Sequence, residues 1–329
     1  MQPFEYTRVH DEAAAIKGLT ANNRARVIAG GTNLLDLMKE HVETPSRLLD
    51  INDLAMTAIE QTGDSVRIGA MARMSDTAAH RTIKEQFPAL SEALLLSASP
   101  QLRNMASIGG NLMQRTRCAY FRDITLGACN KRNPGSGCSA IAGENRMHAI
   151  LGTSPACIAT HPSDFAVALV ALDGIVQVHG PKGSRDIPAV DFHLLPGETP
   201  QREHALAHDE IIVAVRVPSA PHAQRSYYLK VRDRASYEFA LTSAAVGLGL
   251  DGSMIRSARV ALGGVGTRPW RSREAEAMLT GKSVSDALFR QAAEAALQSA
   301  KPQRQNGFKV ELAKRTLVRA LQTVAGGAA

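Results

Sequence analysis

The stretch RARVIAGGTNLLDLMKEH, residues 24–41, predicts a strand, a tight turn built on two glycines, and then a helix. Around it, FEYTRV (4–9) and SRLLDIN (46–52) predict two more strands, and HDEAAAIKGL (10–19) predicts a helix. Strands that alternate with helices are typical of α/β units. We therefore expect a small α/β unit over about residues 1–60.

A second unit is expected over residues 61–218. SVRIGAMAR (65–73) and EIIVAVRVP (210–218) predict strands, and GIVQVHGPKGSRDIP (174–188) predicts a hairpin. Alanines and leucines at helical spacing predict one or two helices between residues 75 and 98. HPSDFAVALVAL (161–172) predicts a helix that is capped near its start by Ser163 or Asp164.

The composition shifts after PSAPHA (218–223), which marks a boundary before a C-terminal domain over residues 222–329. RSYYLKVRD, TSAAVGLGL and SARVALGGVG predict a three-stranded antiparallel sheet, and long helices are expected from residue 271 onward. The expected fold class is α+β, with several small mixed sheets rather than one doubly wound sheet.

Four cysteines, Cys118, Cys129, Cys138 and Cys157, lie within forty residues of a turn-rich, basic segment. Two disulfides would suit a small secreted domain better than this chain. A zinc site usually uses paired CxxC ligands, whereas the gaps here are ten, eight and eighteen residues. An iron–sulfur cluster tolerates long loops, and nearby arginines and lysines favour thiolates. The pattern favours the cluster, with zinc and disulfides as alternatives.

Two glycine turns, AGGTN (29–33) and SIGGN (107–111), follow predicted strand or helix segments. Glycines there let backbone N–H groups approach an anion, and Asn33 and Asn111 can bond phosphate oxygens. Neither turn matches GxGxxG or a P-loop, so neither the Rossmann nor the NTPase interpretation follows. The alternative is two unrelated structural turns. Asp164 is equally ambiguous, because it can bond a flavin or cap a helix.

Charge and patterning argue against several other functions. The net charge is +7, but no block of five like charges appears and the aromatics are not interleaved with basic residues, so nucleic acid is not expected. The N-terminal residues do not form a secretory signal, and no apolar run is long enough to cross a membrane. Neither a Ser-His-Asp nor an HExxH arrangement is found.

Taken together, AGGTNLLDLMK, SIGGNL, HPSDFAVALVAL, LAHDEIIVAVRVP and YYLKVRDRASYEFAL, in this order, resemble the medium, FAD-binding subunit of molybdenum hydroxylases. The resemblance covers essentially the whole chain. It implies a FAD-binding domain of the p-cresol methylhydroxylase (PCMH) type, made of two α/β subdomains, and a C-terminal domain like that of the carbon monoxide dehydrogenase flavoprotein. With its cysteine-bearing insertion at about 115–158, the chain resembles in particular the flavin subunit of periplasmic aldehyde oxidoreductases. That subunit carries a [4Fe-4S] cluster besides FAD.

The resemblance implies roles for individual residues. One loop would wrap the FAD pyrophosphate through backbone N–H groups, and a second turn would clamp it. Asp164 would bond the FAD, Leu206 would lie near the isoalloxazine, and Lys230 would be a basic residue near the flavin. Cys118, Cys129, Cys138 and Cys157 would ligate the cluster. The two loops consist of Ile28, Ala29, Gly30, Gly31, Thr32, Asn33 and Leu34, and of Ser107, Gly109, Gly110 and Asn111.

The expected function is that of an oxidoreductase subunit that transfers electrons but does not itself oxidise the substrate. A large molybdenum-cofactor subunit would hydroxylate an aldehyde, a small subunit with two [2Fe-2S] clusters would relay electrons, and FAD here would deliver them to an external acceptor. The expected location is periplasmic, through a partner's signal, with the cytoplasm as the alternative. Alternative functions are a subunit like that of xanthine dehydrogenase or 4-hydroxybenzoyl-CoA reductase, a stand-alone flavin reductase, or a flavin-free zinc scaffold.

Overall fold

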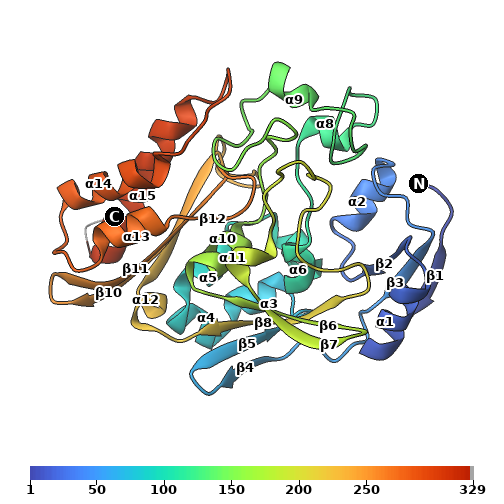
Figure 1. Ribbon diagram of the computed structural model, residues 1–329. Helices are drawn as coiled ribbons and strands as arrows, with labels where there is room; N and C mark the ends of the chain where they lie inside the picture. Colours follow the sequence, from blue (N-terminus) through green and yellow to red (C-terminus); the bar gives the residue numbers. More distant parts are fainter. Residues whose placement is uncertain (327–329) are drawn as a thin grey trace.

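The computed structural model describes residues 1–326, and within them the strands form three sheets arranged along the molecule (Figure 1). The first sheet is parallel, in the order β1-β3-β2, with β1 Glu5–Arg8, β2 Ala25–Ile28 and β3 Arg47–Asp50. Helices α1 (Glu12–Ala21) and α2 (Leu34–Lys39) connect these strands. The strand–helix alternation predicted around residues 24–41 is therefore present.

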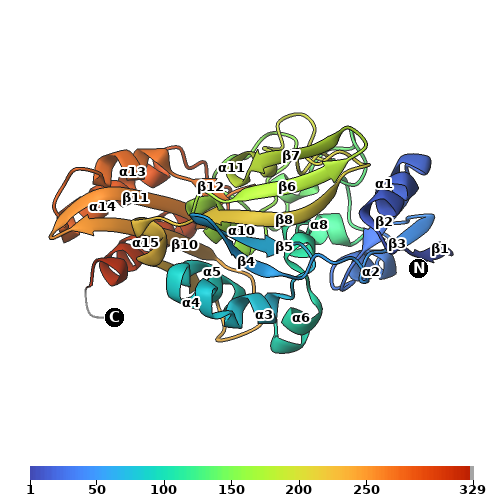
Figure 2. The same ribbon diagram turned by 90° about the horizontal axis from the view of Figure 1, so that it is seen from below.

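The second sheet has five antiparallel strands in the order β4-β5-β8-β6-β7. Seen from below, it lies between the first sheet and the C-terminal sheet (Figure 2). Its strands all fall between residues 59 and 218, although the domain boundaries themselves stay predictions. The strands are β4 Ile59–Thr62, β5 Ser65–Gly69, β6 Ile175–Gly180, β7 Gly183–Pro188 and β8 Ile211–Pro218.

Short helices follow β5 in the chain, and two more flank β6 and β7. The prediction of one or two helices between residues 75 and 98 was too low, because the structure has three there. Pro88 begins the third of them, in keeping with the preference of proline for a first helical turn. These helices are α3 Met74–Ala79, α4 Arg81–Gln86, α5 Pro88–Leu95, α6 Pro100–Met105, α7 Ile108–Leu112, α10 Asp164–Ala171 and α11 Ala189–Phe192.

The third sheet is antiparallel, in the order β12-β11-β10-β9, and the expectation of three strands missed the shortest one. Strand β12 contains only Trp270 and Arg271, too short for a period-2 pattern to be visible. The α+β fold class is otherwise confirmed. The remaining elements are β9 Ser226–Val231, β10 Thr242–Asp251, β11 Met254–Gly263, α12 Pro221–Gln224, α13 Arg273–Leu279, α14 Asp286–Leu297 and α15 Phe308–Ala325.

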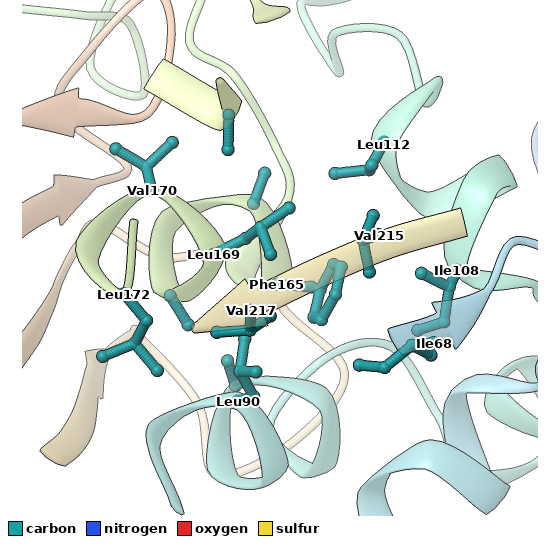
Figure 3. Close-up of a cluster of buried hydrophobic side chains, with 14 of the residues drawn as sticks. Ile68, Leu90, Ile108, Leu112, Phe165, Leu169, Val170, Leu172, Val215 and Val217 are labelled. Carbon is teal, nitrogen blue, oxygen red and sulfur yellow. The ribbon is translucent and has the colours of Figure 1, made fainter. Parts of the chain in front are cut away.

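Helix α10 forms the centre of the largest hydrophobic core. All of its residues are buried, which fits a helix that is apolar on every side. Figure 3 shows Phe165 and Leu169 of α10 among Val215 and Val217 of β8 and Leu90 of α5. Ser163 caps the helix by accepting a hydrogen bond from the Ala166 N–H at 2.9 Å, so the predicted cap is confirmed.

The cysteine-bearing insertion has little regular structure. It contains two one-turn helices, α8 (Ala119–Arg122) and α9 (Ser139–Ala142), which lie on one side of the molecule (Figure 1). Its fully buried Phe121 packs against Leu37 of α2. The insertion is therefore held by contacts with the rest of the chain. Within residues 1–326, no helix is both long and apolar enough to cross a membrane.

Candidate functional site

The first glycine turn connects β2 to α2, and both of its glycines are needed for the backbone itself. Gly31 has a φ of +71°, which side chains with a Cβ rarely adopt. A Cβ on Gly30 would overlap the carbonyl oxygen of Met105. The backbone conformation of this turn alone therefore accounts for both glycines. The turn also lines a cavity, so a structural role and a ligand-binding role do not exclude each other.

The second glycine segment, predicted as a turn, forms the short helix α7, which Ser107 caps by accepting a hydrogen bond from the Gly110 N–H at 3.2 Å. The Gly109 N–H donates to the carbonyl of Ala70 at 2.8 Å. A Cβ on Gly110 would lie only 2.9 Å from the Ser107 hydroxyl, which caps the helix, but Gly110 itself is exposed to solvent. The backbone at Gly110 can thus be approached closely by a ligand.

Both turns line one cavity of about 480 Å³, which we call the first cavity. This volume lies in the range of ordinary cofactor sites. Leu206 also lines it, so segments distant in sequence meet here as the resemblance implies. The residues predicted to bind FAD that line the first cavity are Ile28, Ala29, Gly30, Gly31, Thr32, Asn33, Leu34, Ser107, Gly109, Gly110 and Leu206.

Asn33 has a donor that no protein group uses. Its Oδ1 accepts a hydrogen bond from the Arg115 N–H at 3.1 Å, while its buried Nδ2 has no partner. A buried N–H without an acceptor is costly, so such a group normally has a ligand or water beside it. The first cavity therefore offers a free donor next to a glycine turn, which suits the oxygens of a diphosphate.

Asn111 does not line the first cavity. Its side chain is buried between helices, where its Oδ1 accepts from the Ser163 hydroxyl at 2.5 Å and its Nδ2 lies 3.3 Å from the Met74 sulfur. Asn111 thus ties α7 to the cap of α10. Its predicted contact with a phosphate has no counterpart in this arrangement.

Asp164 is at the centre of a buried polar network. Its Oδ1 accepts from the Tyr228 hydroxyl at 2.6 Å, and its Oδ2 accepts from Lys230 Nζ at 2.8 Å and from the Ser97 hydroxyl at 3.0 Å. Burial and the neighbouring carboxylate raise the pKa of Tyr228 well above its ordinary value, so Tyr228 stays a donor. Asp164 and Lys230 are therefore in direct contact, and their predicted roles beside FAD stay predictions.

Tyr228 was not among the predicted residues, although the sequence contains a signal for it. Residues two apart on a strand point to the same face of a sheet. Tyr228 and Lys230 are such a pair on β9, so a functional Lys230 implies that Tyr228 faces the same site.

Asp164 lines a second cavity of about 380 Å³, together with His161, Ser163, Phe239 and Cys118. The side chain of Lys230 is almost completely buried beneath it and pairs with Asp164. The residues that resemblance assigns to FAD are therefore distributed over two cavities, with Leu206 in the first and Asp164 in the second.

The four cysteines surround one small space, which we call the cysteine cavity. Cys118, Cys129, Cys138 and Cys157 all line it, and all four are free thiols. Cys129 and Cys138 face each other across an isolated antiparallel bridge. The disulfide alternative is thus absent from this structure. Among residues 1–326, no three histidine, cysteine or acidic side chains converge closely enough to hold one ion.

Burial disfavours the charged form of two of the thiols, those of Cys118 and Cys157. It raises the pKa of Cys118 to about 12 and that of Cys157 to about 11, against which backbone hydrogen bonds and Lys131 act only in part. The basic residues that the sequence places around the thiols mostly pair with carboxylates instead. These basic residues were predicted to stabilise thiolates. A cation that is already paired with a carboxylate has only a weak electrostatic effect on a nearby thiol, so their main contacts are ion pairs within the fold.

Arg115 connects three parts of the chain. Its guanidinium contacts Glu43 Oε1 and Glu203 Oε2, each at 2.5 Å, and Lys131 Nζ lies 2.7 Å from Glu203. Burial opposes ionisation of Glu203, but Arg115 and Lys131 outweigh it and hold its pKa below the ordinary value. Arg122 pairs in the same way with Asp36 and Glu40 of the α2 region. These ion pairs fasten the insertion to the first unit.

His148 was also missed, and it lies beside a cysteine. Its Nε2 is 3.2 Å from the Cys118 sulfur, while its buried Nδ1 has no partner. Burial, with a smaller contribution from Lys309, lowers the pKa of His148 to about 4, so the ring is neutral near pH 7. The sequence RMHAI around it contains no motif that would have indicated this contact.

Comparisons with known proteins agree with the two-part organisation. Residues 2–220 match the family described as FAD binding domain in molybdopterin dehydrogenase, and residues 227–324 match the CO dehydrogenase flavoprotein C-terminal domain. The aldehyde oxidoreductase FAD-binding subunit PaoB of Escherichia coli is 50% identical over 325 residues, covering 98% of both chains. This chain belongs to the FAD-binding medium subunits of the molybdenum hydroxylase family.

Other members of the family are more distant. The glyceraldehyde dehydrogenase medium chain of Sulfolobus acidocaldarius is 28% identical over 288 residues, which cover 87% of this chain and 84% of that one. A solved structure of carbon monoxide dehydrogenase from Hydrogenophaga pseudoflava superposes with a TM-score of 0.77 at 25% identity, covering 98% and 97% of the two chains. The resemblance drawn from the sequence is confirmed, and FAD is the cofactor of this family's domain.

The free donor of Asn33 gives a direct test of the FAD site. Replacing Asn33 by Asp keeps the Oδ1 that Arg115 contacts but substitutes a negative oxygen for the Nδ2 donor. Repulsion of the diphosphate should weaken FAD binding roughly ten- to hundredfold, equivalent to about 1.4–2.8 kcal/mol. FAD dissociation constants from flavin fluorescence would measure this.

The same change at the exposed Asn23, outside the cavity, is the matched control and should leave FAD binding unchanged. Equal FAD affinity in native protein and the Asn33→Asp variant would contradict the placement of the diphosphate.

Proposed function

We propose that this chain is the electron-transferring flavoprotein subunit of a molybdenum-containing aldehyde oxidoreductase. The observation that carries the proposal is the 50% identity, over 98% of both chains, to the FAD-binding subunit of an aldehyde oxidoreductase. Among more distant relatives, the glyceraldehyde dehydrogenase medium chain belongs, by its name, to an enzyme whose substrate is an aldehyde. Oxidation of the aldehyde itself belongs to a large molybdenum-cofactor partner, with a small [2Fe-2S] partner between the two.

The residues of the first cavity suit the diphosphate of FAD. The backbone N–H groups of Ile28–Leu34, the free Nδ2 of Asn33 and the open backbone at Gly110 would hold its oxygens. Apolar Leu206 contributes a wall that excludes water. FAD, when bound, supplies the electron-carrying chemistry, which the side chains of a protein cannot supply themselves.

We assign the second cavity to a further part of FAD because Asp164, which the resemblance predicts to bond the cofactor, lines it. Leu206, the residue predicted to lie near the isoalloxazine, lines the first cavity. Hydrogen bonds from Tyr228, Lys230 and Ser97 fix the Asp164 carboxylate, so its position is set before the cofactor binds. Groups that are already oriented bind a ligand without further ordering cost. The role of these residues is to position and shield the flavin.

A [4Fe-4S] cluster held by Cys118, Cys129, Cys138 and Cys157 completes the proposal. The four free thiols line a common space, and a [4Fe-4S] cluster takes four thiolate ligands. Binding would remove the proton from each thiol, and the thiolates would then balance the charge of the iron. The family descriptions of this chain's two domains mention FAD or flavoprotein only, so the cluster is a proposal from the cysteines.

The destination of the electrons and the compartment are proposed from the resemblance alone. We infer an external acceptor that receives electrons from this subunit, and a periplasmic complex exported through a signal on a partner subunit. Fractionation of cells that express all three subunits would test the location. Activity confined to the cytoplasmic fraction would rule out export.

The electron-transfer function predicts that this chain alone does not respond to aldehyde. In the purified three-subunit complex without acceptor, an aldehyde should bleach the flavin absorption within one turnover. The isolated chain with FAD should keep its absorption under the same conditions. Stopped-flow absorbance measures both. Bleaching in the isolated chain would instead support a stand-alone flavin enzyme.

The cluster predicts a different loss. Cys129→Ala should reduce the iron of this chain from about four atoms toward zero and remove the broad iron–sulfur absorption, while FAD content is retained. Leu126→Ala, at an exposed position of the same insertion, is the control and should keep both cofactors. Iron and zinc analysis gives the result, and one zinc with no iron would favour a structural metal site.

A further inference from the structure

The contact between His148 and Cys118 has a defined direction once Cys118 binds metal. The sulfur of a ligating cysteine is a thiolate, which has no proton and can only accept a hydrogen bond. The histidine atom 3.2 Å from that sulfur, Nε2, must then carry the ring proton. His148 Nδ1 is left as an acceptor, and no protein donor reaches it.

We propose that His148 is a positioning residue that donates a hydrogen bond from Nε2–H to the Cys118 thiolate and thereby raises the reduction potential of the cluster. The proposal rests on the proposed [4Fe-4S] cluster. Reduction adds one electron and makes the cluster and its sulfurs more negative. A hydrogen bond to a sulfur becomes stronger when that sulfur is more negative, so it stabilises the reduced form.

Cys118 is a well-placed ligand for such control. Among the four cysteines it alone lines the second cavity as well as the cysteine cavity. His148 lines the second cavity too. The hydrogen bond is therefore on the side of the cluster that faces the second cavity, the proposed site of part of the FAD.

The histidine is fixed by the C-terminal domain. Lys309 of α15 is completely buried, and its Nζ donates to the carbonyls of Met147 at 3.0 Å, His148 at 3.2 Å and Gly264 at 2.8 Å. Asn306 Nδ2 donates to the His148 carbonyl at 3.1 Å. A buried lysine amino group needs hydrogen-bond acceptors, and here Nζ donates to two carbonyls of the turn at residues 147 and 148 and to that of Gly264, which joins the turn to the end of β11.

The backbone on the other side of His148 is fixed as well. The His148 N–H donates to the Asn145 carbonyl at 3.0 Å, and Asn145 exchanges hydrogen bonds with Gln305 at 2.7 and 3.0 Å. Because the main chain is held from both directions, the ring has little freedom to move away from Cys118. Metal ligands are commonly oriented by such surrounding groups, whose loss changes the properties of the metal site.

The test compares two substitutions in the complete three-subunit complex. His148→Leu removes the donor, whereas His148→Gln carries an N–H at nearly the position of Nε2. The midpoint potential of the cluster is measured by redox titration followed by electron paramagnetic resonance, using the signal that is absent from Cys129→Ala. His10→Leu, at an exposed histidine of the first unit, is the control.

We expect His148→Leu to retain iron and to shift the cluster to a more negative potential. A tenfold drop in the ratio of reduced to oxidised cluster at fixed potential, the size expected for one hydrogen bond, corresponds to about 59 mV. His148→Gln should have a midpoint potential close to that of the native protein, and His10→Leu should leave the potential unchanged. A purely structural role would not be rescued by the donor in this way.

The outcomes separate this inference from the cluster itself. Native protein without iron would overturn the proposed cluster. Native potential in an iron-loaded His148→Leu variant, or the same shift in the Leu and Gln variants, would overturn the role of His148. If His148→Leu loses its iron, His148→Gln decides: a native potential supports the hydrogen bond, and a lowered potential or loss of iron contradicts it.

Discussion

The two halves of the site depend on one partly buried cation, Arg115. Its guanidinium joins Glu43, near the first glycine turn, to Glu203, and its backbone N–H fixes the side chain of Asn33. Three residues later the chain reaches Cys118. A single ion-pair network thus sets both the wall of the FAD cavity and the start of the cysteine insertion. Removing one charged residue from such a network leaves its partner without a counter-charge. Loss of one ion pair is therefore expected to destabilise the other contacts of Arg115 as well.

The glycine turns show how structural and functional demands coincide. Gly30 and Gly31 are required by the close approach of Met105 and by a left-handed backbone, and a Cβ on Gly110 would crowd the Ser107 hydroxyl. The fold therefore explains all three glycines without a ligand. The unpaired Nδ2 of Asn33 is the better indicator of a ligand, because the fold gains nothing from leaving a donor without an acceptor.

Much of this arrangement could be predicted from local pattern. Strand and helix periodicity gave most elements, and the crowding of four cysteines into forty residues predicted their convergence. The misses are of another kind. Asn111 turns inward to Ser163, Tyr228 joins Asp164, and His148 reaches Cys118 across thirty positions of loop. Tertiary packing determines such contacts. Loops lack the regular repeat of helices and strands, so the spacing of residues in the sequence does not predict which side chains face each other.

The clamp of Lys309 on residues 147 and 148 also imposes an order on biosynthesis. Helix α15 spans Phe308–Ala325, so it leaves the ribosome more than 150 residues after the last cysteine, Cys157. All four thiols are therefore synthesised before the helix that fixes the turn beside Cys118. The four ligands of the proposed cluster are complete in the growing chain before Lys309 can hold His148 in place.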